Sequence, residues 1–245
     1  MEKMSADHVL KEGPRLGSLA GDFSPLSAIP VAGLIFDMDG TLVDNMHVHN
    51  DAWETWHRRH NIPFNRETFF HETAGRANRE VVKWAKPDAT ELELDTLGLE
   101  KEAIYREIYR GQMVPLPGLL AVIAACEAHG QKMSVATAAP PENAALVLDG
   151  LDLRRHFVTV VSPSMGYRGK PHPDLFLAAA QAMGLEPAQC VVFEDAPLGI
   201  EAAANAGMRA VGVTTMLDAD TLQAANVVFS VRDFTDDRLK GLLGL

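Results

Sequence analysis

The chain has 245 residues, and 47% of them are hydrophobic, which is enough to bury a substantial core. Its 33 acidic residues outnumber 22 lysines and arginines, and the net charge of −11 argues against nucleic acid or an anionic membrane as a partner. No apolar run approaches the roughly 20 residues that span a bilayer. Cys126 and Cys190 are isolated in apolar surroundings, so we expect buried free thiols. We expect a cytoplasmic protein that is a monomer.

The first 29 residues differ in character from the rest of the chain. They mix charged residues with glycines and contain no apolar stretch of the kind that forms a secretory signal. We interpret residues 1–29 as an N-terminal extension, and we expect the fold to begin at about residue 30.

Short apolar runs alternate with helical patterns along most of the chain. The intervening helical patterns are rich in alanine, and they begin near a proline and end at a glycine. Because the apolar runs do not alternate with polar residues, both faces of the sheet should be covered. This pattern predicts an α/β fold with a doubly wound, Rossmann-like parallel sheet. The expected strands are 31–36, 132–137, 157–161, 190–193, 209–213 and 227–229, and the clearest helices are 117–130, 173–184 and 197–207.

The segment from 45 to 111 interrupts this alternation. It has helical patterns only, and it holds all three tryptophans and five of the nine histidines. With fewer than about 70 residues it would hardly be stable alone, so we expect it to rest on the sheet domain. We predict a small α-helical cap domain at 45–111, inserted into a core domain made of 30–44 and 112–245. Two chain crossings, near 43–46 and 111–115, would suit a lid that opens and closes.

Polar clusters follow several of the predicted strands. Asp37 and Asp39 end the first strand and precede Gly40 and Thr41, Thr137 ends the second, Glu194 and Asp195 end the fourth, and Lys170 stands in "RGKPHPD". In a parallel sheet such strand ends meet at one crevice. Four carboxylates at close range cannot all ionise without a cation, and carboxylate oxygens suit Mg²⁺. Lys170 adds a positive charge, which indicates an anionic ligand.

An EF-hand is the other interpretation of "DMDG". That motif needs a glutamate at its twelfth position, and counting from Asp37 places Val48 there. The calcium-binding interpretation is therefore excluded.

The order "DMDGT", a threonine at a strand end, "KPHPD" and "FEDAPLGIEAAANAG" resembles the four motifs of the haloacid dehalogenase superfamily, over residues 30–215. The insertion resembles the α-helical cap of its subfamily I, which includes β-phosphoglucomutase and many sugar- and polyol-phosphate phosphatases. The resemblance implies that Asp37 is a nucleophile forming an aspartyl-phosphate and that Asp39 is the general acid/base. The implied metal ligands are Asp37, Asp39 through its backbone carbonyl, Glu194 and Asp195; the implied phosphate-binding residues are Gly40, Thr41, Thr137, Ala138 and Lys170.

Candidate substrate-binding residues in the cap come from the same resemblance. The loop "AGRANRE" resembles the cap's specificity loop, and Asn78 stands where the mutase pattern has an arginine. His49 and Lys101 match cap residues that face the active site. Two alternatives stay open: His49 belongs to a packed helix face with Trp53, Trp56 and His60, and Lys101 is a solvated lysine paired with surface acids. The cap candidates are His49, Gly75, Arg76, Asn78, Arg79 and Lys101.

These features indicate a Mg²⁺-dependent phosphatase acting on a small phosphorylated metabolite, a sugar or polyol phosphate. The resemblance supplies a reason for Asp39, because dehalogenases lack an acid/base there: a halide leaves without a proton. The alternatives are a β-phosphoglucomutase-like phosphotransferase, an inorganic pyrophosphatase, or a catalytically silent binding protein with the same fold. Position 78 is an asparagine rather than an arginine, which counts against the mutase, because a mutase must hold the second phosphate of a bisphosphate intermediate.

Overall fold

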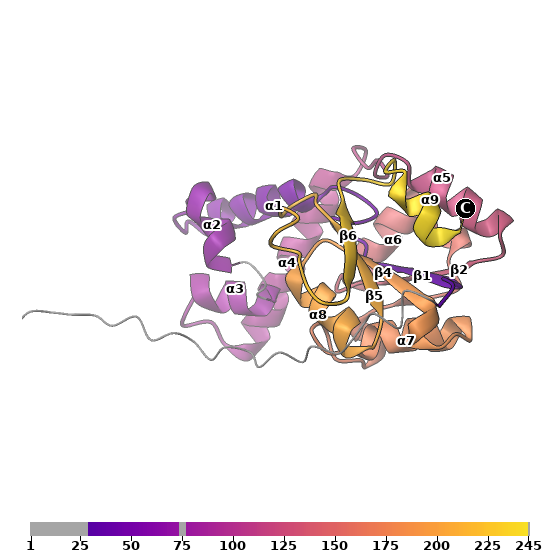
Figure 1. The fold of residues 1–245 in the computed structure, drawn as a ribbon. Coiled ribbons are helices and arrows are strands. Elements are labelled where there is room, and N and C mark those ends of the chain that lie inside the picture. Colours follow the sequence, from indigo (N-terminus) through magenta and orange to yellow (C-terminus); the bar gives the residue numbers. More distant parts are fainter. Residues whose placement is uncertain (1–28, 74–76, 245) are drawn as a thin grey trace, which may run out of the picture.

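The computed structural model describes residues 29–73 and 77–244, and its centre is one parallel sheet (Figure 1). The six strands lie in the order β3-β2-β1-β4-β5-β6, and every neighbouring pair is parallel. The strands are β1 (Gly33–Phe36), β2 (Lys132–Ala136), β3 (Val160–Val161), β4 (Cys190–Glu194), β5 (Arg209–Val213) and β6 (Val227–Val231). This confirms the predicted doubly wound fold, with β1 at the middle of the sheet.

Helices cover both faces of the sheet. α5 (Leu119–Ala128), α6 (Pro141–Gly150) and α9 (Arg238–Leu243) share one hydrophobic cluster with alternate strand residues such as Leu34 and Phe36. α7 (Asp174–Met183) and α8 (Pro197–Asn205) share the other cluster with Ile35 and Val192. Successive strand residues are thus apolar on both sides, which is why the strand sequences show no polar alternation.

Of the five helices between β1 and β2, the first four lie beside the sheet, at the left of Figure 1. We call them the cap helices: α1 (Met46–Arg59), α2 (Arg66–Thr73), α3 (Asn78–Ala85) and α4 (Glu91–Tyr109). Their apolar core is continuous with that of the sheet domain, since Val48 and Trp56 belong to the same cluster as Met38 and Leu42. This continuity agrees with the expectation that the insertion rests on the sheet.

Two predicted elements are shorter than expected for local reasons. The run 157–161 forms only the two-residue strand β3, because Phe157 ends a 3₁₀ turn over Arg154–His156. The helix expected at 117–130 begins at Leu119, since Gly118 takes a φ of +79° at the N-cap and lies against the backbone of Phe234. A side chain at that glycine would need both a strained backbone and space that Phe234 fills.

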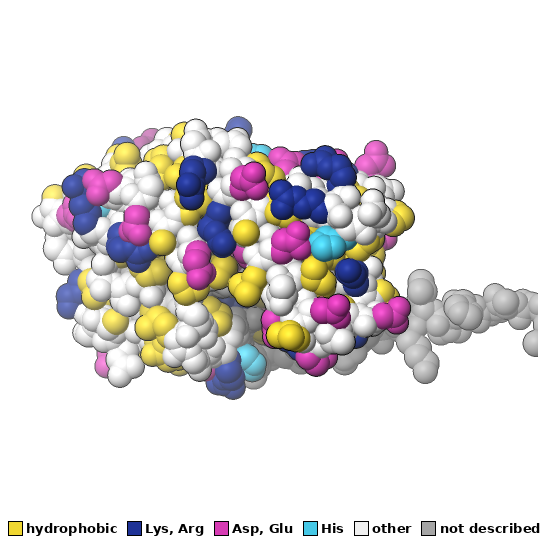
Figure 2. All heavy atoms as spheres, turned by 180° about the vertical axis from the view of Figure 1, so that it is seen from behind, with side chains coloured by type: hydrophobic (Ala, Val, Ile, Leu, Met, Phe, Trp, Pro, Cys, Tyr) yellow, Lys and Arg dark blue, Asp and Glu magenta, His cyan; other side chains and the backbone are white. Residues whose placement is uncertain are grey.

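Properties expected from composition are also found in the described part of the chain. Cys126 and Cys190 are free and buried, and burial raises the pKa of both thiols to about 11. Within residues 29–73 and 77–244, no helix combines the length and apolar character required to cross a membrane. The face shown in Figure 2 carries lysine and arginine side chains interspersed with aspartate and glutamate, rather than a continuous basic surface.

Candidate active site

Three carboxylates meet at the carboxyl edge of the sheet. Asp37 directly follows β1, and its backbone N–H donates to the carbonyl of Phe193 in β4 at 2.9 Å. Because β1 and β4 are parallel neighbours, Asp37 lies beside Glu194, the last residue of β4. Carboxylate oxygens of Asp37, Glu194 and Asp195 all lie within 4.8 Å of one another, and all three residues are buried. We call these three residues the acidic cluster.

Two glycines allow the backbone to close around the acidic cluster. Gly40 has a φ of +80°, and a Cβ there would lie 2.0 Å from Oδ2 of Asp195. A Cβ at Gly199, on α8, would lie 2.0 Å from the carboxyl carbon of Glu194. Neither overlap is possible for a real side chain, so both positions require glycine while the carboxylates keep these places.

Lys170 is the cation that contacts the acidic cluster. Its Nζ lies 2.5 Å from Oδ1 of Asp37 and 2.8 Å from Oε2 of Glu194, and 9% of its side chain is exposed. Burial by itself would lower the pKa of Lys170, but the two ion pairs outweigh it and raise the pKa above its usual range. Lys170 is therefore a charged ammonium that bridges residues from two strand ends.

The acidic cluster holds more negative charge than Lys170 can balance. Burial, together with the charges of Glu194 and Asp39, raises the pKa of Asp37 to about 8. Burial and the charges of Glu194 and Asp37 raise the pKa of Asp195 as well. A divalent cation would remove this penalty, and the donors are all oxygens, as hard cations require. The residues present therefore fit a magnesium-type ion.

Hydroxyl and backbone groups surround the same edge. Thr137 directly follows β2, is 1% exposed, and accepts a hydrogen bond from the N–H of Ala139 at 3.0 Å. Ala138 between them is exposed. Thr41 is fully buried, and its hydroxyl has no hydrogen-bond partner among the described residues. Buried hydroxyls at this edge are available as donors to an oxyanion.

Asp39 is held by a residue that sequence reasoning missed. Nδ2 of Asn45 donates to Oδ1 of Asp39 at 2.5 Å and to Oη of Tyr105 at 2.6 Å, while its Oδ1 accepts from the N–H of Gly40 at 3.1 Å. Asn45 precedes α1, where asparagine usually caps the helix. It makes no side-chain cap bond here. Asn45 is fully buried, and this burial results from tertiary contacts rather than from a local sequence pattern.

His49 and Lys101 lie on the cap side of Asp39. Nε2 of His49 is 3.9 Å from Oδ1 of Asp39, and Nζ of Lys101 is 2.8 Å from Nδ1 of His49. Lys101 is 2% exposed, so the alternative of a solvated lysine is wrong. Trp53 and Trp56 are buried in the hydrophobic core, as the packed-face alternative expects, whereas His60 bonds Glu100. One face of α1 therefore does two things: its tryptophans pack in the hydrophobic core, and its His49 lies near Asp39.

Glu102 is a second residue that sequence reasoning missed. Its Oε1 accepts from Lys101 at 2.9 Å and from Asn78, and its Oε2 accepts from Nδ2 of Asn143 at 2.5 Å. Burial alone would raise the pKa of Glu102, but the charge of Lys101 and the hydrogen bonds from Lys101 and Asn78 lower it to about 2. Asn143 lies on α6, so Glu102 joins the cap helices to the sheet domain.

Three of the substrate-binding residues predicted in the cap are not found near Asp39 in the described part of the structure. Both terminal nitrogens of Arg79 pair with acids of α4, Glu91 and Asp95, on the exposed surface. Gly75 and Arg76 lie outside the described residues. The roles predicted for these three residues stay predictions.

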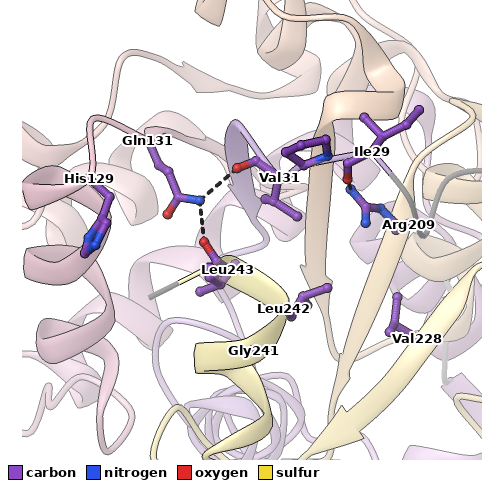
Figure 3. A pocket seen from close by; sticks show the side chains of 11 residues that line it. Ile29, Val31, His129, Gln131, Arg209, Val228, Gly241, Leu242 and Leu243 are labelled. Atoms are coloured by element: carbon purple, nitrogen blue, oxygen red, sulfur yellow. Dashed lines mark hydrogen bonds between the residues drawn. The ribbon is translucent and has the colours of Figure 1, made fainter.

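A cavity of about 660 Å³ lies at the opposite, amino-terminal ends of the strands (Figure 3). It is lined by Val31 before β1, Gln131 before β2, Arg209 at the start of β5, and residues near the end of α9. Figure 3 shows Gln131 bonded to the carbonyls of Val31 and Leu243, which matches distances of 2.8 and 2.9 Å. None of the predicted site residues lines this cavity, so the acidic cluster is the stronger candidate site.

Comparisons with known proteins agree with this geometry. A family model for haloacid dehalogenase-like hydrolases matches residues 31–207. Fructose-1-phosphate phosphatase YqaB of Escherichia coli (strain K12) is 37% identical over 183 residues, which cover 74% of this chain and 96% of that protein. Beta-phosphoglucomutase of Bacillus subtilis (strain 168) is 32% identical over 200 residues, which cover 76% and 86%.

The fold has close structural counterparts. A crystal structure of a HAD hydrolase of family IA, variant 3, from Entamoeba histolytica matches with a TM-score of 0.80 at 22% identity. The match covers 87% of this chain and 98% of the other. At this identity the likeness concerns the fold, including the helices inserted after β1.

Proposed function

Because the chain belongs to the haloacid dehalogenase-like hydrolases and is a phosphohydrolase, we propose that it is a Mg²⁺-dependent phosphatase for a sugar or polyol monophosphate. The proposed reaction passes through an aspartyl-phosphate. The observation that carries this proposal is the acidic cluster bonded to Lys170, with Asp39 beside it in a separate hydrogen-bonded setting. The two aspartates thus have different surroundings and can have different roles.

In the first displacement, a carboxylate oxygen of Asp37 attacks phosphorus and the bond to the sugar oxygen breaks. Asp39 gives its proton to that oxygen, so the alcohol leaves neutral. In the second displacement, Asp39 takes a proton from water, the hydroxide attacks phosphorus, and the aspartyl-phosphate bond breaks to release phosphate. One residue serves both steps because the proton lost in the first is regained in the second.

Other groups would stabilise charge on the phosphoryl oxygens. Lys170 neutralises part of the charge between Asp37 and the phosphoryl group, and Thr137 donates its hydroxyl. Asp37, Glu194, Asp195 and the backbone carbonyl of Asp39 would hold the metal. A bound Mg²⁺ would supply further charge neutralisation at the phosphoryl group.

The substrate class is supported by the relatives and by the charges on the cap helices. The relatives include a protein named for fructose 1-phosphate and one named as a mutase. Among the described cap residues near the site, Lys101 is paired with Glu102, and Asn78 is uncharged. A mutase needs a cation that grips a second phosphate, and these pairings favour a monophosphate with hydroxyls at its other end.

Phosphate release from fructose 1-phosphate and a panel of sugar and polyol phosphates tests the proposal, with and without Mg²⁺. We expect Mg²⁺-dependent turnover, and Asp37→Asn should lower kcat by at least about 1,000-fold because the amide is a poor nucleophile. Wild-type turnover by Asp37→Asn would disprove the nucleophile assignment. Inorganic pyrophosphate in the panel and a coupled assay for glucose 6-phosphate from β-glucose 1-phosphate test the two enzymatic alternatives.

A further inference from the structure

A network of buried and partly buried polar side chains connects α6 of the sheet domain to Asp39 through α4. We propose that Glu102 is a positioning residue, which joins the docking of α4 on α6 to the placement of the acid/base Asp39. The inference rests on the proposed function, because it assigns Glu102 a part in the proton transfers of that reaction. We call the connected side chains the α4 network: His49, Asn78, Lys101, Glu102, Arg106 and Asn143.

The first part of the network is the junction of α4 with α6. Asn143 is fully buried in the first turn of α6, just after the loop that holds Thr137. Its Nδ2 donates to Glu102 at 2.5 Å, and its Oδ1 accepts from Arg106 at 2.8 Å. An arginine only donates and a carboxylate only accepts, so Asn143 has one possible amide orientation. Exchanging the Glu102 carboxylate for an amide leaves one acceptor oxygen in place of two, so either Asn143 or the pair Lys101 and Asn78 loses its acceptor.

The second part connects Glu102 to His49. Glu102 is the carboxylate beside the buried ammonium of Lys101, and Lys101 also contacts Nδ1 of His49 at 2.8 Å. A charged ammonium has no lone pair, so Nδ1 of His49 must accept. The imidazole proton is then on Nε2, which is the nitrogen 3.9 Å from Oδ1 of Asp39. Glu102 thus favours the charge state of Lys101 that sets the tautomer of His49.

The third part holds the imidazole in place. The ring of His49 stacks on Tyr105, with 4.0 Å between ring centroids and 9° between planes. Tyr105 stands on the same helix as Glu102, and its hydroxyl accepts from Asn45, which also donates to Asp39. A shift of α4 on α6 would therefore change both neighbours of Asp39 together. Glu102 fixes the position of α4 on α6, because it stands on α4 and accepts a hydrogen bond from Asn143 on α6.

This role predicts a dependence on the leaving group. A sugar alkoxide needs a proton from Asp39 to leave, whereas p-nitrophenolate leaves without one. Loss of Glu102 should therefore slow phosphoryl transfer from a sugar phosphate but not from p-nitrophenyl phosphate. Hydrolysis of the aspartyl-phosphate still needs Asp39 as a base, so it should be slow with either substrate.

The experiment is rapid mixing of Glu102→Gln with p-nitrophenyl phosphate and, separately, steady-state turnover of fructose 1-phosphate, both with Mg²⁺. We expect kcat for fructose 1-phosphate to fall about 10- to 100-fold. With p-nitrophenyl phosphate we expect a burst of about one nitrophenolate per active site at the wild-type first-turnover rate, followed by slow turnover. Glu100→Gln is the matched control on the same helix, since Glu100 is partly exposed and its hydrogen bond among the described residues goes to His60, outside the α4 network. This variant should behave as wild type.

Asn143→Ala tests the same junction from α6, and it should give the same burst and the same loss with the sugar phosphate. The inference is overturned if Glu102→Gln slows the first turnover of p-nitrophenyl phosphate as much as it lowers kcat for fructose 1-phosphate, or if it leaves both at wild-type rates. It is also overturned if Asn143→Ala, folded by circular dichroism, retains full turnover of the sugar phosphate. The proposed function fails separately, when the wild-type protein releases no phosphate from either ester with Mg²⁺.

Discussion

The acidic cluster and the α4 network each contact a lysine with little exposed surface, but the charges around the two lysines are balanced differently. The acidic cluster has three carboxylates for the single ammonium of Lys170. In the α4 network, Lys101 and Glu102 pair one to one, and both oxygens of Glu102 accept hydrogen bonds. A buried excess of charge calls for a ligand, whereas the Lys101–Glu102 pair is balanced and hydrogen-bonded and therefore fixes geometry. This difference separates the place of the chemistry from the part that aligns it.

Among the changes that test this comparison, removing Lys170 should give the largest effect, because it increases the charge excess of the acidic cluster. We expect Lys170→Met to lower kcat by about 100- to 1,000-fold, since a group that stabilises the phosphoryl charge is lost. Without Mg²⁺ the variant should lose about 3 kcal/mol in free energy of unfolding, because Asp37 and Glu194 lose their buried partner. Urea unfolding with and without Mg²⁺ measures this, and Mg²⁺ should stabilise the variant more than the wild type.

The control for that measurement is Lys240→Met, which removes an exposed ammonium paired with Asp237 on α9. It should change neither kcat nor the effect of Mg²⁺, because exposed pairs contribute little. If Lys170→Met matches this control in both measurements, then the charge of the acidic cluster has no bearing on function, and the contrast with the α4 network is lost.

Asn45 lies where the two regions meet, and its replacement should have an intermediate effect. Asn45→Asp keeps the shape but cannot donate to Asp39, and it places two carboxylates within 2.5 Å at their present positions. We expect kcat for a sugar phosphate to fall about 10- to 50-fold because the acid/base is displaced. Asn65→Asp is the control: Asn65 is an exposed acceptor for backbone N–H groups at the start of α2, and aspartate can accept there equally. Equal kcat values for the two variants would contradict a role for Asn45 in holding Asp39.

The acidic cluster could be predicted from sequence, and the α4 network largely could not. Asp37, Lys170 and Glu194 follow recognisable strand ends or stand in a motif, and parallel strands bring such ends together wherever they lie in the chain. Glu102 and Asn143 are single polar residues within helical patterns, where an exposed surface position is the ordinary expectation. Their burial depends on how α4 packs on α6, and no local sequence pattern predicts that packing. The six strands were predicted for the same reason as the cluster, since their apolar runs are local.

Arg79 should give the smallest effect, and it tests how far the substrate site extends over the cap helices. Its ion pairs with Glu91 and Asp95 are exposed, and exposed pairs contribute less than about 1 kcal/mol. We therefore expect Arg79→Ala to lower the free energy of unfolding by no more than that and to leave kcat/KM within about twofold of wild type. Arg66→Ala, which breaks comparable exposed pairs with Asp51 and Glu54, is the matched control. A tenfold loss of kcat/KM in Arg79→Ala alone would mean that Arg79 leaves its acids to bind the substrate, as the specificity-loop resemblance implies. The ion pairs of Arg79 with Glu91 and Asp95 would then be a property of the free enzyme only, and the substrate would carry a second anionic group.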